Sequence, residues 1–277
     1  MDLYDESTFT CSKVITKLYS TSFSLGIKML DHKYHNAIYA IYGFVRYADE
    51  IVDTFHTHDK KELLDEFKSD TYRSIAQGIS LNPVLHSFQK TVNQYKIEHE
   101  LIDAFLHSME MDLYKNEYTE QKYTEYIYGS AEVVGLMCLR VFCEGNEAQY
   151  QELKPGAKSL GAAFQKVNFL RDMKSDFDER GRVYFPGVNF SHFNNQAKIL
   201  IEENIKKDFD DAYLAILKLP KGARLGVYLA YIYYQALFKK IKKLSPTTIV
   251  SERVRVPDNI KILLLIQSYF KFRFNTI

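Results

Sequence analysis

Two acidic segments of the chain repeat an oxygen-bearing side chain at four-residue spacing. The first, RYADEIVD, carries Asp49 and Asp53. The second, QKVNFLRDMKSDFDERGRVYFP, carries Asn168, Asp172 and Asp176. In a helix, residues four apart lie one turn apart on the same face, so each segment predicts a polar stripe. The carboxylates of a stripe repel one another, and either water or a cation must screen them.

A divalent cation fits these stripes if their two helices face each other, because four carboxylates and one amide would then line one cavity. Unpaired negative charge of that size is very costly in a low-dielectric interior. Mg²⁺ removes the cost, since it prefers oxygen ligands and shares its remaining positions with water and substrate phosphates. With arginines nearby, the pattern predicts a site for a diphosphate carried on Mg²⁺, with Mn²⁺ as the alternative metal. The simpler interpretations are a solvated acidic face for the first stripe and a buried hydrogen-bond network for the second.

The elements that must position these stripes are helices. Apolar residues recur at three- and four-residue spacing, and alternating strand patterns are nearly absent outside RGRVYFPGVNF. We expect eight to ten helices, at about 8–25, 33–56, 60–78, 84–97, 99–115, 120–145, 148–179, 192–217, 221–244 and 258–272. The six prolines are expected at helix ends: Pro83, Pro155, Pro186, Pro220, Pro246 and Pro257. No linker rich in Gly, Ser or Pro is visible, so residues 1–277 are predicted to form a single all-α domain.

Composition excludes several classes of partner and site. The net charge of +1 gives no reason to expect a nucleic-acid partner. Three sparse cysteines, Cys11, Cys138 and Cys143, predict a reducing cytoplasm rather than a disulfide framework. The first residues, MDLYDESTFTCSK, do not resemble a signal peptide, and the longest apolar stretches fall short of the ~20 residues that a membrane span needs. We therefore expect a soluble or peripheral protein, of open oligomeric state.

The two motifs, in this setting, resemble those of the squalene/phytoene synthase family, the head-to-head prenyltransferases. Three further stretches carry the resemblance: YSTSFSLGIKML, YIYGSAEVVGLMC, and the pair YLAYIYY and SERVRVP. The likeness covers nearly the whole chain and is nearest to bacterial phytoene synthases. It implies an isoprenoid synthase helical bundle with a central cavity.

The resemblance also implies a reaction. Two molecules of geranylgeranyl diphosphate would condense through a cyclopropyl intermediate, prephytoene diphosphate, to phytoene, with Mg²⁺ neutralising the leaving diphosphate. By the same resemblance, the metal ligands are Asp49, Asp53, Asn168, Asp172 and Asp176. The four acids would act in catalysis with Arg46 and Tyr42. Substrate contacts are expected from Ser22, Phe23, Tyr128, Gln165, Asn168, Arg171, Tyr233 and Arg253.

The chain has an unusual aromatic content, with 21 Tyr and 19 Phe but no Trp. The resemblance implies that some of these rings line a dry tunnel that holds two prenyl tails. Phe23, Tyr42 and Tyr128 are its candidate lining residues, and core packing is the simpler role for each. Gly129 and Gly135 are expected either to let helices approach closely or to leave tunnel volume. The loop 181–186 is expected to cover the site or simply to end a helix.

Phytoene does not dissolve in water, so the same resemblance implies peripheral contact with the cytoplasmic membrane. The stretch ILLLIQSYFKFRF is the candidate contact, with a core-facing role as the alternative.

Competing functions are squalene or dehydrosqualene synthesis from farnesyl diphosphate, with NADPH in the squalene case, and a non-catalytic relative that acts as an assembly factor. A terpene cyclase fits the second motif less well.

Overall fold

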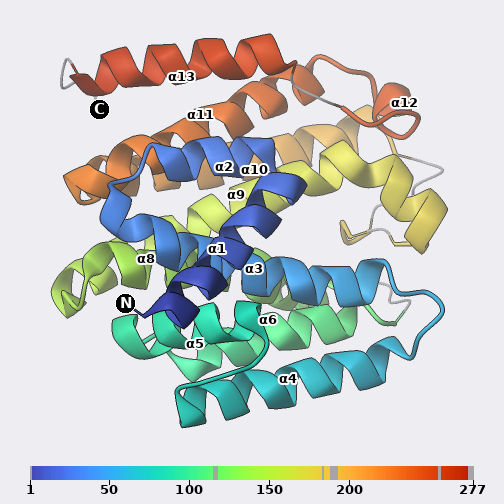
Figure 1. Cartoon of the computed structure of the whole chain (residues 1–277). Coiled ribbons are helices and arrows are strands. Elements are labelled where there is room, and N and C mark those ends of the chain that lie inside the picture. Colours follow the sequence, from blue (N-terminus) through green and yellow to red (C-terminus); the bar gives the residue numbers. More distant parts are fainter. Residues whose placement is uncertain (1, 115–117, 183, 188–192, 255–256, 274–277) are drawn as a thin grey trace.

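The described elements are all helices (Figure 1). Their side chains line a central cavity. The computed structural model describes residues 2–114, 118–182, 184–187, 193–254 and 257–273. The first helices are α1 (Leu3–Tyr19), α2 (Thr21–Lys28), α3 (His32–Asp53), α4 (Lys60–Gln77), α5 (Pro83–Tyr95) and α6 (His99–Met111). They are followed by α7 (Glu120–Ile127), the π-helical turn η1 (Tyr128–Glu132), α8 (Val133–Cys143), α9 (Glu147–Arg180), α10 (Asn195–Lys218), α11 (Lys221–Lys242), α12 (Pro246–Ile249) and α13 (Asp258–Arg273).

Two groups of helices pack on either side of this cavity. In one group, α3 packs against α1, α4, α5 and α6, and the ring of Phe44 stacks on Phe88 at 3.8 Å between centroids. In the other, α9 packs against α10 and α11. The run from α7 through η1 to α8 contacts both α6 and α9 and joins the two groups. Helices α3 and α9 therefore belong to different groups, and their C-terminal ends lie on the same side of the molecule, at the right of Figure 1.

Both ends of α9 are capped, which fixes the register of its polar stripe. The side chain of Asn146 accepts a hydrogen bond from the backbone N–H of Gln149 at the N-terminus. At the C-terminus Gly181 adopts a left-handed conformation with φ of 64°, and the N–H groups of Gly181 and Arg182 donate to the carbonyls of Phe177 and Asp176. A helix of 34 residues is about 51 Å long. It can therefore present apolar residues at one end of the cavity and polar residues at the other.

Two predicted helices are interrupted in the structure. The helix expected at 8–25 is two helices, because Ser20 is extended and its side chain caps α2 by accepting from the N–H of Phe23. The helix expected at 120–145 contains the π-turn η1. Pro155 was expected at a helix end but lies inside α9. The helix expected at 192–217 begins at Asn195, and residue 192 lies outside the described residues.

The run Glu120–Cys143 meets the length and apolarity of a membrane span, but 56% of its most apolar window is buried inside the bundle. Its contacts with α6 and α9 are those of a core helix. The three cysteines are unpaired.

The glycine at the start of η1 has no room for a side chain. A Cβ atom on Gly129 would lie 2.4 Å from the carbonyl oxygen of Ala104 and 2.7 Å from the Cβ of Ser108, both on α6. Gly135 is less crowded, since its nearest neighbour would be the carbonyl oxygen of Ala157 at 3.0 Å, and it also lines the cavity. Close helix approach is therefore observed at both glycines, and Gly135 leaves cavity volume as well.

We expect Gly129→Ala to destabilise the fold by about 1–3 kcal/mol, because η1 must move away from α6 to admit the methyl group. Thermal or urea unfolding followed by circular dichroism measures the change. Gly26→Ala is the matched control, since its Cβ would meet its nearest atom at an ordinary 3.5 Å. Equal stability of the two variants would contradict the close contact at Gly129.

Candidate functional site

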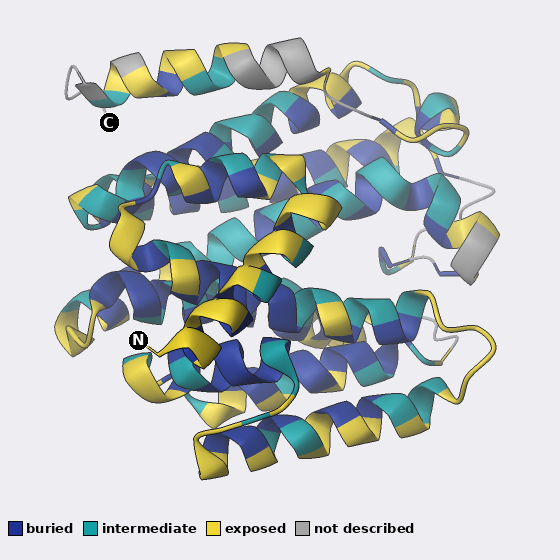
Figure 2. Cartoon of the chain, viewed as in Figure 1, coloured by how far each residue is buried: buried dark blue, intermediate teal, exposed yellow. Residues whose placement is uncertain are grey.

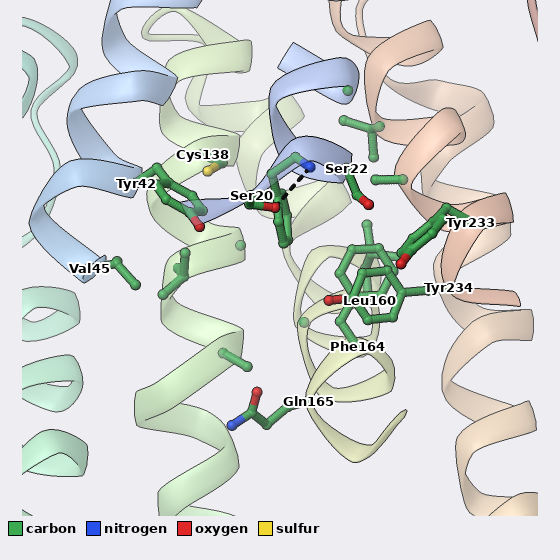
Figure 3. A pocket seen from close by; sticks show the side chains of 18 of the residues that line it. Ser20, Ser22, Tyr42, Val45, Cys138, Leu160, Phe164, Gln165, Tyr233 and Tyr234 are labelled. Atoms are coloured by element: carbon green, nitrogen blue, oxygen red, sulfur yellow. Dashed lines mark hydrogen bonds between the residues drawn. The ribbon is translucent and has the colours of Figure 1, made fainter. Parts of the chain in front are cut away.

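A cavity of about 1040 Å³ lies between the two groups of helices. Its wall comes from α2, α3, α8, α9, α10 and α11, together with residues just before α13. Figure 3 shows Tyr42 from α3, Phe164 and Gln165 from α9, and Tyr233 and Tyr234 from α11 around it. The two predicted stripes thus come from helices that share one cavity.

The cavity wall changes from apolar to charged along both α3 and α9. On α3 the lining residues run Ile38, Ile41, Tyr42, Val45, Arg46 and Asp49. On α9 they run Leu153, Gly156, Ala157, Leu160, Gly161, Phe164, Gln165, Asn168 and Arg171. Because the two helices point the same way, the charged residues meet at one end, which we call the polar end, and the remainder is the apolar part.

Arg46 is held at the polar end by three neighbours. Its guanidinium lies 3.7 Å from a carboxylate oxygen of Asp49, donates to Glu50 one turn further on, and sits 4.3 Å from the centre of the Tyr19 ring. The Nε of Arg46 is buried and has no hydrogen-bond partner. That donor is available to an anion that enters the cavity.

Asp49 lies in a crowded acidic environment. Burial raises the pKa of its carboxyl group to about 7, Arg46 lowers it, and the charges of Asp53 and Asp112 raise it further. The side chain of Asp49 is 36% exposed, because it borders the cavity. A cation placed against Asp49 would relieve this repulsion and lower its pKa again.

Asp172, in the second stripe, is paired with two arginines. Arg171 donates from Nε to both carboxylate oxygens at 3.0 Å, and the Nε of Arg253 lies 2.7 Å from Oδ1. Burial opposes the charge of Arg171, but the hydrogen bond to Asp172 and the charge interactions with Asp172, Tyr234 and Tyr233 together outweigh burial and raise the pKa of the guanidinium. Arg171 and Arg253 line the cavity and Asp172 does not, so the two cationic side chains lie between Asp172 and the cavity.

The rest of the stripe on α9 is ordered by aromatic residues. Tyr234 donates its hydroxyl to the amide oxygen of Asn168 at 3.2 Å, and the Asn168 amide nitrogen donates to Gln165 at 3.5 Å. The ring of Tyr234 stacks on Phe164 at 3.9 Å between centroids (Figure 3). This stack fixes the side of α9 on which the polar end begins.

Asp53 and Asp112 share a counter-ion that sequence reasoning missed. Arg182 lies 3.5 Å from Asp53 and 3.4 Å from Asp112, and it also donates to the Asp112 carbonyl at 2.5 Å. Tyr126 donates to Asp112 at 2.7 Å. Burial raises the pKa of Asp112 to about 6, while Arg182 and Tyr126 lower it. The cluster is buried and ties the end of α6 to the segment that follows α9.

This cluster also bears on the loop expected to cover the site. Arg182, Tyr184 and Phe185 are all buried, and Tyr184 stacks on Phe169 of α9. Burial raises the pKa of Tyr184, with further contributions from Asp112 and Asp176, so Asp176 lies within electrostatic reach of the cluster. The described residues of the loop are therefore anchored in the protein, and Val183 lies outside them.

Most predicted site residues meet at the cavity, but fewer carboxylates line it than we expected. Those in the wall are Ser22, Phe23, Tyr42, Arg46, Asp49, Gln165, Asn168, Arg171, Tyr233 and Arg253. Asp53, Asp172 and Asp176 are not among the lining residues, because two of them turn toward arginines and Asp176 is buried.

Tyr128 requires a correction. It is absent from the wall, and the Nζ of Lys158 lies 5.1 Å from the centre of its ring. Tyr126, two residues earlier, lines the cavity instead. The π-turn changes the helical register at this point, which a regular helix pattern cannot predict. Sequence reasoning also missed Tyr19, Asp112 and Tyr234. Tyr19 and Tyr234 lie in the stretches YSTSFSLGIKML and YLAYIYY that carry the resemblance, whereas no motif surrounds Asp112.

The acids suit a divalent cation by chemistry, although they do not converge in the described structure. No group of three or more His, Cys, Asp or Glu side chains forms a metal-binding cluster among the described residues. The raised pKa of Asp49 and the pairing of Asp53 and Asp172 with arginines both indicate excess negative charge at the polar end. The oxygen donors of the two stripes therefore fit Mg²⁺ or Mn²⁺ in type.

We expect Arg182→Gln to destabilise the fold by about 3 kcal/mol or more, since it leaves Asp112 without its buried counter-ion. Adding Asp112→Asn should restore part of the loss, which chemical denaturation of the single and double variants measures. Lys174→Gln, which breaks an exposed pair with Asp178, is the control and should cost less than about 1 kcal/mol. An Arg182→Gln protein as stable as the control would rule out the cluster.

Comparison with known proteins bears on the family and the fold of the chain. A 4,4'-diapophytoene synthase from Staphylococcus haemolyticus is 26% identical, over 78% of this chain and 74% of that protein. Phytoene synthase 2 of Solanum lycopersicum, a chloroplastic enzyme, is also 26% identical, over 87% of this chain and 83% of its own. The crystal structure of a dehydrosqualene synthase superimposes with a TM-score of 0.80 at 19% identity, over 97% of this chain and 98% of that one.

These likenesses confirm the predicted all-α isoprenoid synthase fold, and the names of the relatives indicate a prenyltransferase-type enzyme. The family model described as squalene/phytoene synthase matches residues 16–259, which include both acidic motifs and Arg253. The chain belongs to the squalene/phytoene synthase family.

Proposed function

We propose that the chain joins two molecules of geranylgeranyl diphosphate head to head and forms phytoene through prephytoene diphosphate. One observation carries the proposal: a single cavity of about 1040 Å³ combines three arginines at its polar end with a long apolar part. A diphosphate and a hydrocarbon tail need these two environments side by side. Membership of the family supports the reaction class.

The arginines bind the diphosphates in this proposal. Arg46 offers its unpaired Nε, and Arg171 and Arg253 offer the donors that now point at Asp172. Guanidinium groups bind phosphate oxygens through two donors at once, and more strongly than neutral donors do. An incoming diphosphate would therefore compete with Asp172 for its arginines and free that carboxylate.

The freed acid is part of the proposed metal site, made of Asp49, Asp53, Asn168, Asp172 and Asp176. When bound there, Mg²⁺ or Mn²⁺ supplies Lewis-acid neutralisation of the leaving diphosphate. Tyr234 orients Asn168 by its hydrogen bond, and Arg46 keeps Asp49 directed at the polar end. Each residue thus reaches the site from a helix whose position the core fixes.

The apolar part of the cavity protects the reaction. Loss of the first diphosphate leaves an allylic cation, which the double bond of the second substrate attacks, and proton loss closes the cyclopropane ring. Water would quench the cation, so the wall must be dry. The rings of Phe23, Tyr42 and Tyr234 stand near the polar end, and each aromatic face near a cation is worth about 0.5–2 kcal/mol. Burial raises the pKa of Tyr42 to about 12, so it remains a neutral phenol.

Two chain lengths of the substrate, C20 and C15, are candidates. Relatives named phytoene synthase and 4,4'-diapophytoene synthase are equally identical to this chain, at 26%. Condensation of two farnesyl diphosphates to dehydrosqualene, or to squalene with NADPH, is the second candidate. It is favoured by the likeness in fold to the dehydrosqualene synthase structure.

Product identification separates these candidates. We expect purified protein with Mg²⁺ and geranylgeranyl diphosphate to give phytoene, without need of NADPH, in a chromatography and mass spectrometry assay. Farnesyl diphosphate, tested with and without NADPH, is the comparison substrate. A product from farnesyl diphosphate alone would replace the C20 proposal, and a cyclic terpene or no hydrocarbon from either donor would reject head-to-head condensation.

Asp172→Asn tests the site itself. It keeps the shape of the side chain but removes its charge, and we expect turnover to fall by at least about 100-fold, since several kcal/mol of charge stabilisation are lost and each 1.36 kcal/mol is tenfold in rate. The rate of hydrocarbon formation measures this, and circular dichroism verifies the helical fold. Asp178→Asn is the matched control, because Asp178 pairs with Lys174 on an exposed part of the same helix. Full activity of Asp172→Asn would mean that the second stripe is not catalytic.

A further inference from the structure

Helix α13 carries apolar side chains on its outward face. It packs on α11 through an inward stripe in which Ser268 is buried and Leu264 and Phe272 are half-buried. On the opposite side Leu263 and Ile266 are 62% and 47% exposed, and Figure 2 shows exposed residues along this outer edge. A helix that is apolar on both faces leaves one of them uncovered by the described protein.

The helices around this face are basic. Nine Lys or Arg residues fall in α2, α11 and α13, one in the first, five in the second and three in the third, against a single acidic residue, Asp258. The whole chain, by contrast, has 36 basic and 35 acidic residues. Positive charge is therefore concentrated on α13, which carries the exposed apolar stripe, and on the two helices that border it. That combination is complementary to an anionic bilayer, which takes apolar side chains below its negative headgroups.

The face also adjoins the cavity. A small hollow of about 20 Å³ lies between α2, α11 and α13, lined by Leu25, Leu229 and Leu264 among others. It shares five lining residues with the large cavity, so these residues lie between the cavity and the hollow beneath α13: Ser22, Phe23, Ala230, Tyr233 and Tyr234. Figure 3 shows Tyr233 beside Tyr234 on α11, at the wall of the large cavity.

We propose that the outward face of α13, flanked by basic α11 and α2, binds the surface of an anionic lipid bilayer, and that the hollow beneath α13 is where a prenyl chain passes between the cavity and the lipid. Binding to the bilayer stands on the exposed stripe and its charge alone. Passage of the chain rests in addition on the proposed function. An apolar product that leaves by this route would not have to cross water.

Vesicle flotation tests the bilayer contact without any enzyme assay. We expect the protein to float with vesicles of phosphatidylcholine and phosphatidylglycerol, and to float at least about tenfold less with phosphatidylcholine alone, because the basic helices need negative headgroups. The variant Leu263→Asp/Ile266→Asp should lose flotation by a similar factor.

The matched control is Ile79→Asp/Leu81→Asp, which removes two exposed apolar residues between α4 and α5, on the side of the molecule away from α13 in Figure 1. It should float like the unchanged protein, and circular dichroism should show both variants folded. The proposal is overturned if the unchanged protein does not float, or if the α13 variant floats as well as the control. It is also overturned if size exclusion shows a dimer that only the α13 variant loses, since a second copy then covers the face.

Turnover with and without vesicles tests the hollow. We expect anionic vesicles to raise multiple-turnover hydrocarbon formation several-fold in the unchanged protein and in the control, and not in the α13 variant, while single-turnover rates stay equal among the three. Equal stimulation of all three would reject the route beneath α13. Flotation without any hydrocarbon product would reject the proposed function together with the route, and leave the bilayer contact standing.

Discussion

The structure depends on one electrostatic constraint: two helices from different packing groups bring their acids to the same end of a cavity. The arrangement is costly, because the acids repel one another and because Asp53, the last residue of α3, lies at the negative end of its helix dipole. Arginines from elsewhere in the chain offset the cost. Arg182 is a counter-ion of Asp53, and Arg171 and Arg253 are counter-ions of Asp172. The proposed function requires such charge, because a metal cation and a diphosphate would be bound together at this end of the cavity.

The packing of the helices turns this constraint into a site. Small residues on α9 and its neighbours, such as Gly161 against Ala131, let the helices approach closely. The shared direction of α3 and α9 then gives one charged end and one apolar part, instead of two mixed surfaces (Figure 1). In the proposed function, substrate binding, positioning and exclusion of water all depend on that single alignment.

The sequence predicted the parts of the site that are local and missed those that depend on distant partners. Spacing within α3 and α9 is local, so the stripes containing Asp49 and Asn168 could be placed on their helices correctly. The pairing of Asp172 with Arg253 spans about a third of the chain and has no local pattern. The same holds for Asp112 and Arg182. Without these arginines, the sequence suggested four carboxylates in the cavity wall, where the described structure has Asp49.

Two predicted helices were wrong because local backbone structure interrupts them, and a hydrophobic pattern does not show such interruptions. Ser20 ends α1 and caps α2 although the apolar spacing continues through it, because its side chain accepts the N–H of Phe23. The π-turn η1 interrupts the regular helix from Tyr128 onward, and the Tyr128 ring lies near Lys158, outside the cavity wall. Periodicity predicts that a helix exists, and backbone hydrogen bonding decides where it breaks.

The central claim is that acids on both helices hold one metal-bound diphosphate, and calorimetric titration of inorganic pyrophosphate tests it most directly. The account predicts binding with Mg²⁺ present, much weaker binding without it, and a similar large loss when either Asp49 or Asp172 is changed to Asn. Pyrophosphate that binds equally well without Mg²⁺, or that is indifferent to one of the two substitutions, would contradict a shared site.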